Sequence, residues 1–372
     1  MSKNARIKAY AKGLKDLGHN IKIYVGFASS LNKHHINKEA TGTWNGLPYE
    51  YLSGTSRYSN GKFNKLFTIL GFWKNLNLLL NGKNYQADIA LVYGSTLFDF
   101  HFWLPKLKRR SGHLSVIYTE LPSLLNPSST QHWIENRLAK YADSLLVVSN
   151  NLVGKFSPIN KQTRLVTPIV VDSSRFSSVH YHASSTIGYL GTFGEKDGVH
   201  FMVNGYLKAK ESLPNLKLTL MGFIAEKGIE DYLIQLTEQY PDIAYLGALE
   251  SDAIPSQLAA CDTLIMNRIN TPYARTGFPI KLAEYLATGI PTLVTNFEEY
   301  HPYVPSDWVY YYQPDDLEDF TSKIIERYEN EDEAVQRSSR AREQVDNVFG
   351  QDKAATELNT IFEELMKTHD AR

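Results

Sequence analysis

The stretch Arg275-Thr-Gly-Phe-Pro-Ile-Lys-Leu-Ala-Glu-Tyr-Leu-Ala-Thr-Gly-Ile-Pro291 predicts a helix with well-marked ends. Pro279 suits the first turn of a helix, where its missing N–H costs nothing. Gly289 suits the helix end, and Pro291 prevents the helix from continuing. We therefore expect a helix from about Pro279 to Thr288, between two short apolar runs typical of buried strands.

The first turn of this predicted helix has the chemistry of a phosphate site. Unpaired backbone N–H groups and the positive end of the helix dipole both favour an anion there. Lys281 adds a cation, and Glu284 and Tyr285 follow on the same face. The lysine and amides suit a diphosphate, and the carboxylate of Glu284 suits ribose hydroxyls. The alternative is a capped core helix whose Lys281 and Glu284 are solvated.

Outward from this stretch, short apolar runs alternate with amphipathic segments, the pattern of an α/β fold with parallel sheets. The expected strands form two series on either side of a serine-rich connector, Ser173–Thr186, which marks a domain boundary near residue 180. We expect domains at residues 1–180 and 181–350, with a helix at 351–367 packing back on the first. The expected strands are Ile21–Phe27, Ile89–Tyr93, Leu114–Tyr118, Leu145–Val148, Ile187–Leu190, Leu216–Met221, Ile243–Leu246, Thr263–Met266 and Thr292–Val294.

The N-terminus departs from this pattern. A doubly wound domain normally opens with a strand and a glycine-rich turn. Here a helical segment, Ala5–Leu17, comes first, and the strand Ile21–Phe27 follows it. We therefore expect the first strand of the N-terminal domain to be missing.

Composition excludes several classes of protein. The 372 residues carry a net charge of −1, so no basic excess indicates nucleic acid as a partner. The single cysteine, Cys261, excludes a disulfide framework and a cysteine-rich zinc site. The pair His34-His35 lacks a third ligand, so we expect no metal. No signal peptide or membrane span is visible, which indicates a cytoplasmic protein.

Five blocks in order resemble GT-B glycosyltransferases, family-4-like, of bacterial surface-polysaccharide pathways. The opening stretch is similar to their Gly-x-Pro donor loop and the helix that follows it. The other blocks are similar to the last strand of the first domain, the interdomain entry, the first turn of the nucleotide domain and the strand before the donor loop; they are Tyr141–Ser149, Pro168–Asp172 with Arg175-Phe176, Tyr189–Gly194 with Asp197-Gly198-Val199, and Ala260–Met266.

The resemblance implies two doubly wound Rossmann-like domains facing each other across a cleft. It implies a retaining sugar transfer from a nucleotide-sugar to a glycan or lipid-linked acceptor, in capsule, exopolysaccharide or lipopolysaccharide synthesis, with no metal and no cofactor. The donor would bind the C-terminal domain and the acceptor the N-terminal one.

Carried over residue by residue, the resemblance places Glu284 on the second glutamate of the family's Glu-x₇-Glu motif, at the ribose. Thr276 falls on the first glutamate, which is absent here. Thr192 and Asp197 fall where the family often has basic residues that clamp the diphosphate. The expected donor-binding residues are Gly191, Thr192, Lys196, Arg268, Arg275, Thr276, Gly277, Phe278, Lys281 and Glu284, with Lys281 also catalytic.

Two further segments are candidates. Glu120 follows a predicted strand at its carboxyl end, where ligands of α/β proteins gather, and is a candidate base or acceptor ligand. Its alternative is an ordinary loop carboxylate. Phe102–Arg110 mixes aromatic and basic residues, which suits an anionic membrane at its inner face. Its alternative is an exposed helix end whose cations complement the dipole.

Two other functions stay open. The substitutions at Thr192, Asp197 and Thr276 also fit a non-catalytic GT-B subunit that binds a nucleotide-sugar. A GT-B-fold nucleotide-sugar epimerase is the other alternative. No Gly-x-Gly-x-x-Gly fingerprint or P-loop occurs, which argues against a dehydrogenase or a P-loop enzyme.

Overall fold

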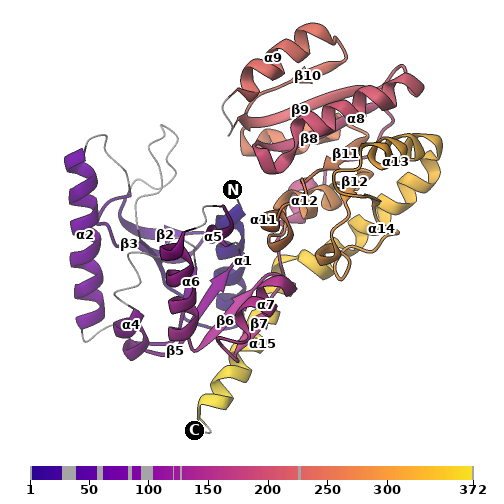
Figure 1. Ribbon diagram of the computed structural model, residues 1–372. Helices are drawn as coiled ribbons and strands as arrows, with labels where there is room; N and C mark the ends of the chain where they lie inside the picture. The colour runs from indigo at the N-terminus through magenta and orange to yellow at the C-terminus, as the bar shows by residue number, and fades with distance from the viewer. Residues whose placement is uncertain are drawn as a thin grey trace.

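A computed structural model describes residues 2–26, 39–56, 62–82, 86–93, 104–119, 121–125, 128–224 and 228–370. The described chain forms an N-terminal half (α1 to β7, together with α15) and a C-terminal half (β8 to α14), seen at the lower left and upper right of Figure 1. None of the described helices combines the length and the apolar character needed to cross a membrane.

The C-terminal half is built on one parallel sheet of six strands in the order β10-β9-β8-β11-β12-β13. Its strands are β8 (Thr186–Phe193), β9 (Lys217–Ile224), β10 (Ile243–Tyr245), β11 (Thr263–Met266), β12 (Thr292–Thr295) and β13 (Tyr310–Tyr312). Its helices are α8 (Val199–Ser212), α9 (Ile229–Gln239), α10 (Ile254–Ala259), α11 (Pro272–Thr276), α12 (Ile280–Thr288), α13 (Leu317–Glu329) and α14 (Glu331–Phe349). Strands β11 and β12 are buried at every residue, as expected for a sheet covered on both faces.

The N-terminal half contains two separate sheets among its described strands. The parallel sheet β4-β5-β6-β7 comprises Ala87–Tyr93, Ser111–Tyr118, Ser144–Val147 and Thr163–Leu165. The second sheet, β1-β3-β2, comprises Ile23–Val25, Leu47–Tyr51 and Thr41–Trp44, with β2 and β3 antiparallel. The prediction of an α/β fold with parallel sheets is confirmed, but the described strands of this half do not join into the single doubly wound sheet that we expected.

The β2–β3 hairpin was missed by the strand pattern. Its turn is Asn45-Gly46, with φ of 51° and 74° at the two residues. Asn-Gly is the favoured pair for a two-residue hairpin, because both positions need positive φ. The signal was therefore present in the sequence, although the flanking residues lack a long apolar run.

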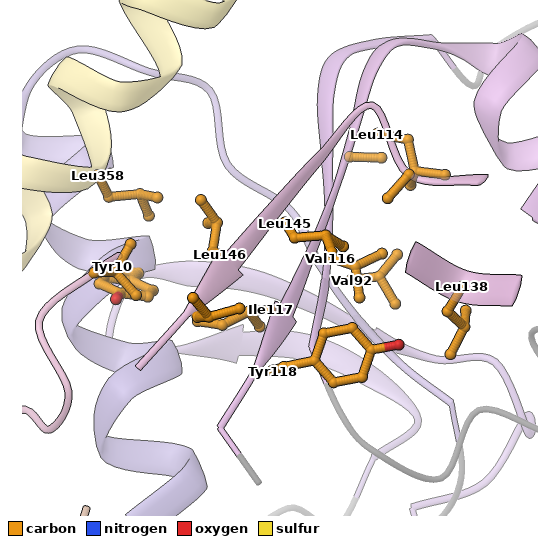
Figure 2. Packing of buried hydrophobic residues seen from close by; sticks show 14 of the residues in the cluster. Tyr10, Val92, Leu114, Val116, Ile117, Tyr118, Leu138, Leu145, Leu146 and Leu358 are labelled. Atoms are coloured by element: carbon orange, nitrogen blue, oxygen red, sulfur yellow. The ribbon is translucent and has the colours of Figure 1, made fainter. Parts of the chain in front are cut away.

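Helices cover both faces of the β4–β7 sheet. They include α1 (Ser2–Asp16), α2 (Lys62–Asn81), α4 (Leu104–Arg110), α5 (Pro122–Leu125), α6 (Ser129–Tyr141), α7 (Asn150–Phe156) and α15 (Gln351–Asp370). Figure 2 shows Tyr10 of α1 and Leu358 of α15 on the side of Leu146, while Leu138 of α6 lies on the opposite side with Leu145. This follows from the alternation of side chains along a strand.

The chain crosses between the halves at two adjacent points. Val171, on the way out of the N-terminal half, forms a parallel bridge with Gly350, and its N–H donates to the carbonyl of Phe349. From Gly350 the chain enters α15, which packs its apolar residues into the same core as α1. The predicted connector Ser173–Thr186 holds one short 3₁₀ turn, Ser173–Phe176, and then runs without regular structure to β8.

Candidate functional site

The site is built where the carboxyl end of β8 meets the first turn of α12. Helix α12 begins at Ile280 with Pro279 at its N-cap and ends at Gly289, whose φ is 70°. The predicted helix is confirmed, with the proline one position earlier than expected. Tyr285 links the helix to the strand by two hydrogen bonds. Its Oη accepts from Leu190 N at 2.8 Å and donates to Leu190 O at 3.1 Å.

Lys281 forms a buried ion pair in this turn. Its Nζ lies 3.0 Å from Asp197 Oδ1 and 2.7 Å from Tyr189 Oη. The lysine side chain is 14% exposed and the aspartate 1%. The solvated alternative for Lys281 is therefore wrong. Gly191 makes room for this pair, since a Cβ there would lie 2.7 Å from Lys281 Nζ.

Burial and the neighbouring charges shift the pKa values of both partners. Burial lowers the pKa of Lys281 to about 8, although the Asp197 charge and hydrogen bond oppose the shift. For Asp197, burial acts to raise the pKa, but the Lys281 charge and hydrogen bond outweigh it and the pKa falls. We therefore take both groups as charged at pH 7. Thr192 Oγ1 also donates to Asp197 Oδ2, at 3.1 Å.

Two more cations lie near this pair. Arg268 is 8% exposed, and among the described residues its Nε has no hydrogen-bond partner. The positive charge of Arg268 and that of Lys196 both act to lower the pKa of Lys281. Lys281 therefore lies near two further cations, at a helix N-terminus that itself favours an anion.

Glu284 lies one turn further along α12 and has a different partner. Its Oε1 accepts from Arg175 Nη1 at 3.4 Å, and the carboxylate side chain is 16% exposed. Burial raises the pKa of Glu284, and Arg175 opposes the shift. The solvated alternative is wrong for Glu284 as well. Arg175 comes from the 3₁₀ turn that follows the crossing at Val171.

The donor loop Arg275–Phe278 contacts the N-terminal half. Ser149 Oγ donates to Thr276 O and Asn151 Nδ2 to Arg275 O, each at 3.0 Å. The hydroxyl of Thr276 donates within the loop to Tyr273 O. Gly277 lies beside Arg268, whose Nη1 would be 3.6 Å from a Cβ built on the glycine.

The remaining loop residues point elsewhere. Arg275 Nε donates to Asn270 Oδ1 at 2.8 Å, on the exposed side of the loop. Phe278 is 8% exposed and packs edge-on against Tyr300 and Tyr303. What Phe278 offers a ligand is therefore its backbone rather than its ring.

Three features that the sequence singled out fall partly or wholly outside the described residues. Glu120 lies outside them, as does the His34-His35 pair, and so do Phe102 and Trp103 of the segment Phe102–Arg110. The rest of that segment forms α4, where Lys108 pairs with Asp143 at 2.6 Å. No group of histidine, cysteine, aspartate and glutamate suited to a metal occurs among the residues that the structure describes.

Sequence reasoning missed some partners in the site. It treated Asp197 only as a departure from the family pattern, whereas its carboxylate holds both Lys281 and Thr192. Arg175, noted as part of the interdomain entry, pairs with Glu284. Glu299 was not singled out; its carboxylate accepts from the N–H groups of Asn150 and Asn151, both at 3.0 Å. An acid side chain in a loop carries no signal of a contact so distant in sequence.

Residues 170–344 match the family model of Glycosyl transferases group 1. The fold is similar to sucrose-phosphate synthase from Thermosynechococcus elongatus, with a TM-score of 0.74 and 15% identity over 99% of this chain and 94% of that one. A glycosyltransferase from Rickettsia africae aligns with a TM-score of 0.69 and 17% identity, covering 98% and 95%. Anabaena HepE in complex with UDP and glucose aligns with a TM-score of 0.62 and 16% identity, covering 88% and 87%.

The search of curated proteins returned no match. At the identities of the solved structures the likeness concerns the fold, and the family match covers the part of the chain that holds the buried cations. Strands β8, β11 and β12, helix α12 and the three cations all lie in the region matched by the glycosyl transferases group 1 model, and the chain is a glycosyltransferase of the GT-B fold.

Proposed function

We propose that the chain transfers a sugar, with retention, from a nucleoside-diphosphate sugar to a glycan or lipid-linked acceptor in bacterial surface-polysaccharide synthesis. The observation that carries the proposal is the surplus of buried positive charge at the first turn of α12. Lys281 is paired with Asp197, and the positive charges of Arg268 and Lys196 act on the same lysine. A diphosphate supplies the missing negative charge.

In this mechanism the bond between the sugar and the diphosphate breaks, and negative charge develops on the leaving phosphate. Lys281 and Arg268, with the amides around Gly277, stabilise that charge. Electrostatic stabilisation of this kind commonly contributes more to the rate than any other single effect. Both cations are already held in place by the protein, so little reorganisation accompanies the step. The mechanism assigns no role to a metal.

The other groups bind rather than react. Glu284 holds the ribose hydroxyls; among the described residues its only partner is Arg175, through one carboxylate oxygen. Gly191 and Thr192 supply the turn after β8, and residues 275–278 the loop above the donor. Residues 181–350 then form the donor domain. Residues 1–180 bind the acceptor, with Glu120 as its base or hydroxyl ligand, at the inner face of the cytoplasmic membrane.

UDP is the first nucleotide to test, because the similar Anabaena protein was crystallised with UDP and glucose. We expect one of UDP, GDP, ADP and CMP to raise the melting temperature. A ligand at 100 times its Kd adds about 2.7 kcal/mol, which corresponds to a few degrees. Lys281→Met and Glu284→Gln should reduce the shift.

Lys155→Met is the matched control, since Lys155 also pairs with a buried carboxylate, Glu135, at 3.0 Å. It should keep the full nucleotide shift. A shift that survives in Lys281→Met would remove Lys281 from the diphosphate site.

A non-catalytic subunit is the second candidate, because Asp197 occupies Lys281 as an internal counter-ion. That protein would bind nucleotide without turnover. Incubating the chain with donor sugar in the presence and absence of acceptor separates these functions. Transfer only with acceptor supports the glycosyltransferase, conversion of donor alone indicates an epimerase, and binding with neither product indicates a subunit.

A further inference from the structure

Helix α2 carries an apolar stripe on its exposed face. Phe67, Leu70 and Leu78 are 67%, 54% and 59% exposed, and they are three of the eight large apolar side chains that the described structure leaves exposed. Lys74 lies on the same face, between Leu70 and Leu78. The spacing of three, four and four residues keeps these side chains in line along about 16 Å of helix.

The opposite face of α2 packs against the core of the N-terminal half. Phe72, Leu76 and Leu80 are at most 3% exposed and pack with the β4–β7 sheet. A helix that needed only to cover this sheet would be polar on its outer face. The exposed apolar side chains of the outer stripe are therefore not needed to cover the sheet, and exposed apolar side chains gathered on one face indicate an interaction site.

Cations from α4 surround the end of this stripe. Lys106 Nζ donates to Asn77 Oδ1 at 3.1 Å, and Arg110 Nε donates to Leu80 O at 2.9 Å, so both side chains lie against α2. Arg109 is exposed beside them. Neither helix contains an aspartate or glutamate. The surface made by α2 and α4 therefore joins an apolar stripe to the cations Lys74, Arg109 and Arg110, while Lys108 of α4 is paired with Asp143.

We propose that this α2–α4 surface docks on an anionic lipid bilayer, with Phe67, Leu70 and Leu78 entering the headgroup boundary and the cations contacting lipid phosphates. An apolar face flanked by Lys and Arg is the pattern of helices that lie in the membrane interface. Figure 1 shows α2 at the outer edge of the N-terminal half, on the side away from the six-stranded sheet.

This docking surface extends the membrane contact included in the proposed function, but it does not depend on the sugar transfer. Helix α4 contributes cations, and α2 contributes the apolar contact. Docking through α2 leaves the C-terminal half outside the membrane-facing surface.

Flotation with lipid vesicles tests the inference without any substrate. We expect the full chain to bind vesicles containing phosphatidylglycerol more tightly than pure phosphatidylcholine vesicles. Replacing Phe67, Leu70 and Leu78 together by serine should weaken binding by about tenfold or more. All three side chains are exposed, so the fold and the thermal shift with nucleotide should be unchanged.

The matched control replaces three exposed apolar residues of the C-terminal half by serine: Phe223, Ile234 and Leu246. That variant should bind vesicles like the unmodified chain.

A second pair of variants tests the contribution of positive charge. Lys74→Gln with Arg109→Gln should weaken binding to anionic vesicles by about tenfold, while Lys161→Gln with Lys353→Gln should not.

Three results would overturn the proposal. The unmodified chain fails to bind anionic vesicles, the α2 triple variant binds as well as its control, or sedimentation shows a dimer that the α2 triple variant abolishes. The last result would assign the stripe to a second copy of the chain. A retained nucleotide shift in any of these cases leaves the proposed sugar transfer intact.

Discussion

Each half of the molecule holds a buried carboxylate paired with a lysine, and the two pairs differ in their surroundings. Glu135 in α6 is 1% exposed and accepts from Ser123 N at 3.0 Å, from Ser123 Oγ at 2.7 Å and from Lys155 at 3.0 Å. Asp197 is also 1% exposed, but its lysine is more deeply buried. Lys281 is 14% exposed, against 27% for Lys155.

The difference lies in the balance of charge. One cation, one backbone N–H and one hydroxyl satisfy Glu135, and its lysine reaches water. Asp197 is paired with Lys281, and the charges of Lys196 and Arg268 act on that lysine too; Arg268 Nε has no hydrogen-bond partner among the residues that the structure describes. An ion pair whose charges cancel holds two elements together. An ion pair with additional cations beside it leaves a net positive charge that an anionic ligand can neutralise. The second arrangement is the one found at the carboxyl end of a parallel strand, where α/β proteins bind ligands.

The largest effect should come from Asp197→Asn compared with Glu135→Gln. Removing one partner of a buried ion pair costs about 3–5 kcal/mol, because the other charge stays buried. We expect that cost for Asp197→Asn at pH 7. For Glu135→Gln we expect about 1–3 kcal/mol, since Lys155 can turn to water. Urea denaturation of both variants measures the difference.

The pH dependence sharpens this comparison. The folded pKa of Lys281, about 8, lies below its ordinary value of 10.5, so the cost of burying its charge is greatest below pH 8 and declines as the pH rises. In Asp197→Asn the lysine loses its proton still more readily. The deficit of that variant should therefore shrink from pH 7 to pH 9. Equal deficits at both values would show that Lys281 is not the charge left behind.

Nucleotide affinity should show the next largest effect. The diphosphate needs protonated Lys281, so the affinity for the active nucleotide should fall above pH 8, by at most about tenfold per pH unit. Lys281→Arg keeps its charge at every accessible pH and should flatten the profile. Isothermal titration calorimetry at pH 7 and pH 9 measures the nucleotide affinity of the unmodified chain and of Lys281→Arg. A profile of identical slope in the two would place the titrating group elsewhere.

The smallest effect concerns the contact between the halves. Glu299 caps the N-terminus of α7 from the C-terminal half, through the N–H groups of Asn150 and Asn151. Loss of a helix cap costs about 1 kcal/mol. Glu299→Ala should lower the stability by about that amount, while the neighbouring Glu298→Ala should not. Thermal unfolding at low and high salt measures the stability of both variants. The same loss of stability in Glu299→Ala and Glu298→Ala would contradict the capping role.

The fold was largely predictable because its signals are local. Continuous apolar runs marked β4, β5, β6, β8, β9, β10, β11 and β12 within a few residues. Proline and glycine marked the ends of α12, and Asp316 caps α13 by accepting from Asp319 N. The strands β7 and β13, each of three residues, were missed; β7 reads Thr-Arg-Leu and has no continuous apolar run.

The site was predictable only in its separate parts. The helix N-terminus and Lys281 follow from one stretch of sequence. The pairing of Lys281 with Asp197 joins residues 84 positions apart, and that of Glu284 with Arg175 joins residues 109 apart. Neither spacing has a periodic signature, because the turn geometry of the folded sheet brings them together. The split of the N-terminal strands into two sheets likewise depends on pairing rather than on strand pattern.

Helix α15 completes the core of the N-terminal half, although it follows the C-terminal half in the sequence. Ala354, Leu358 and Leu365 belong to the same buried cluster as Ala9 and Tyr10 of α1. A ribosome makes the α1 residues early and the α15 residues after the whole six-stranded sheet, while domains tend to fold as they emerge. The N-terminal half must therefore wait, with one flank of its core open, until the C-terminal half has been made. During synthesis that flank exposes apolar side chains, and transiently exposed apolar surface is prone to aggregate.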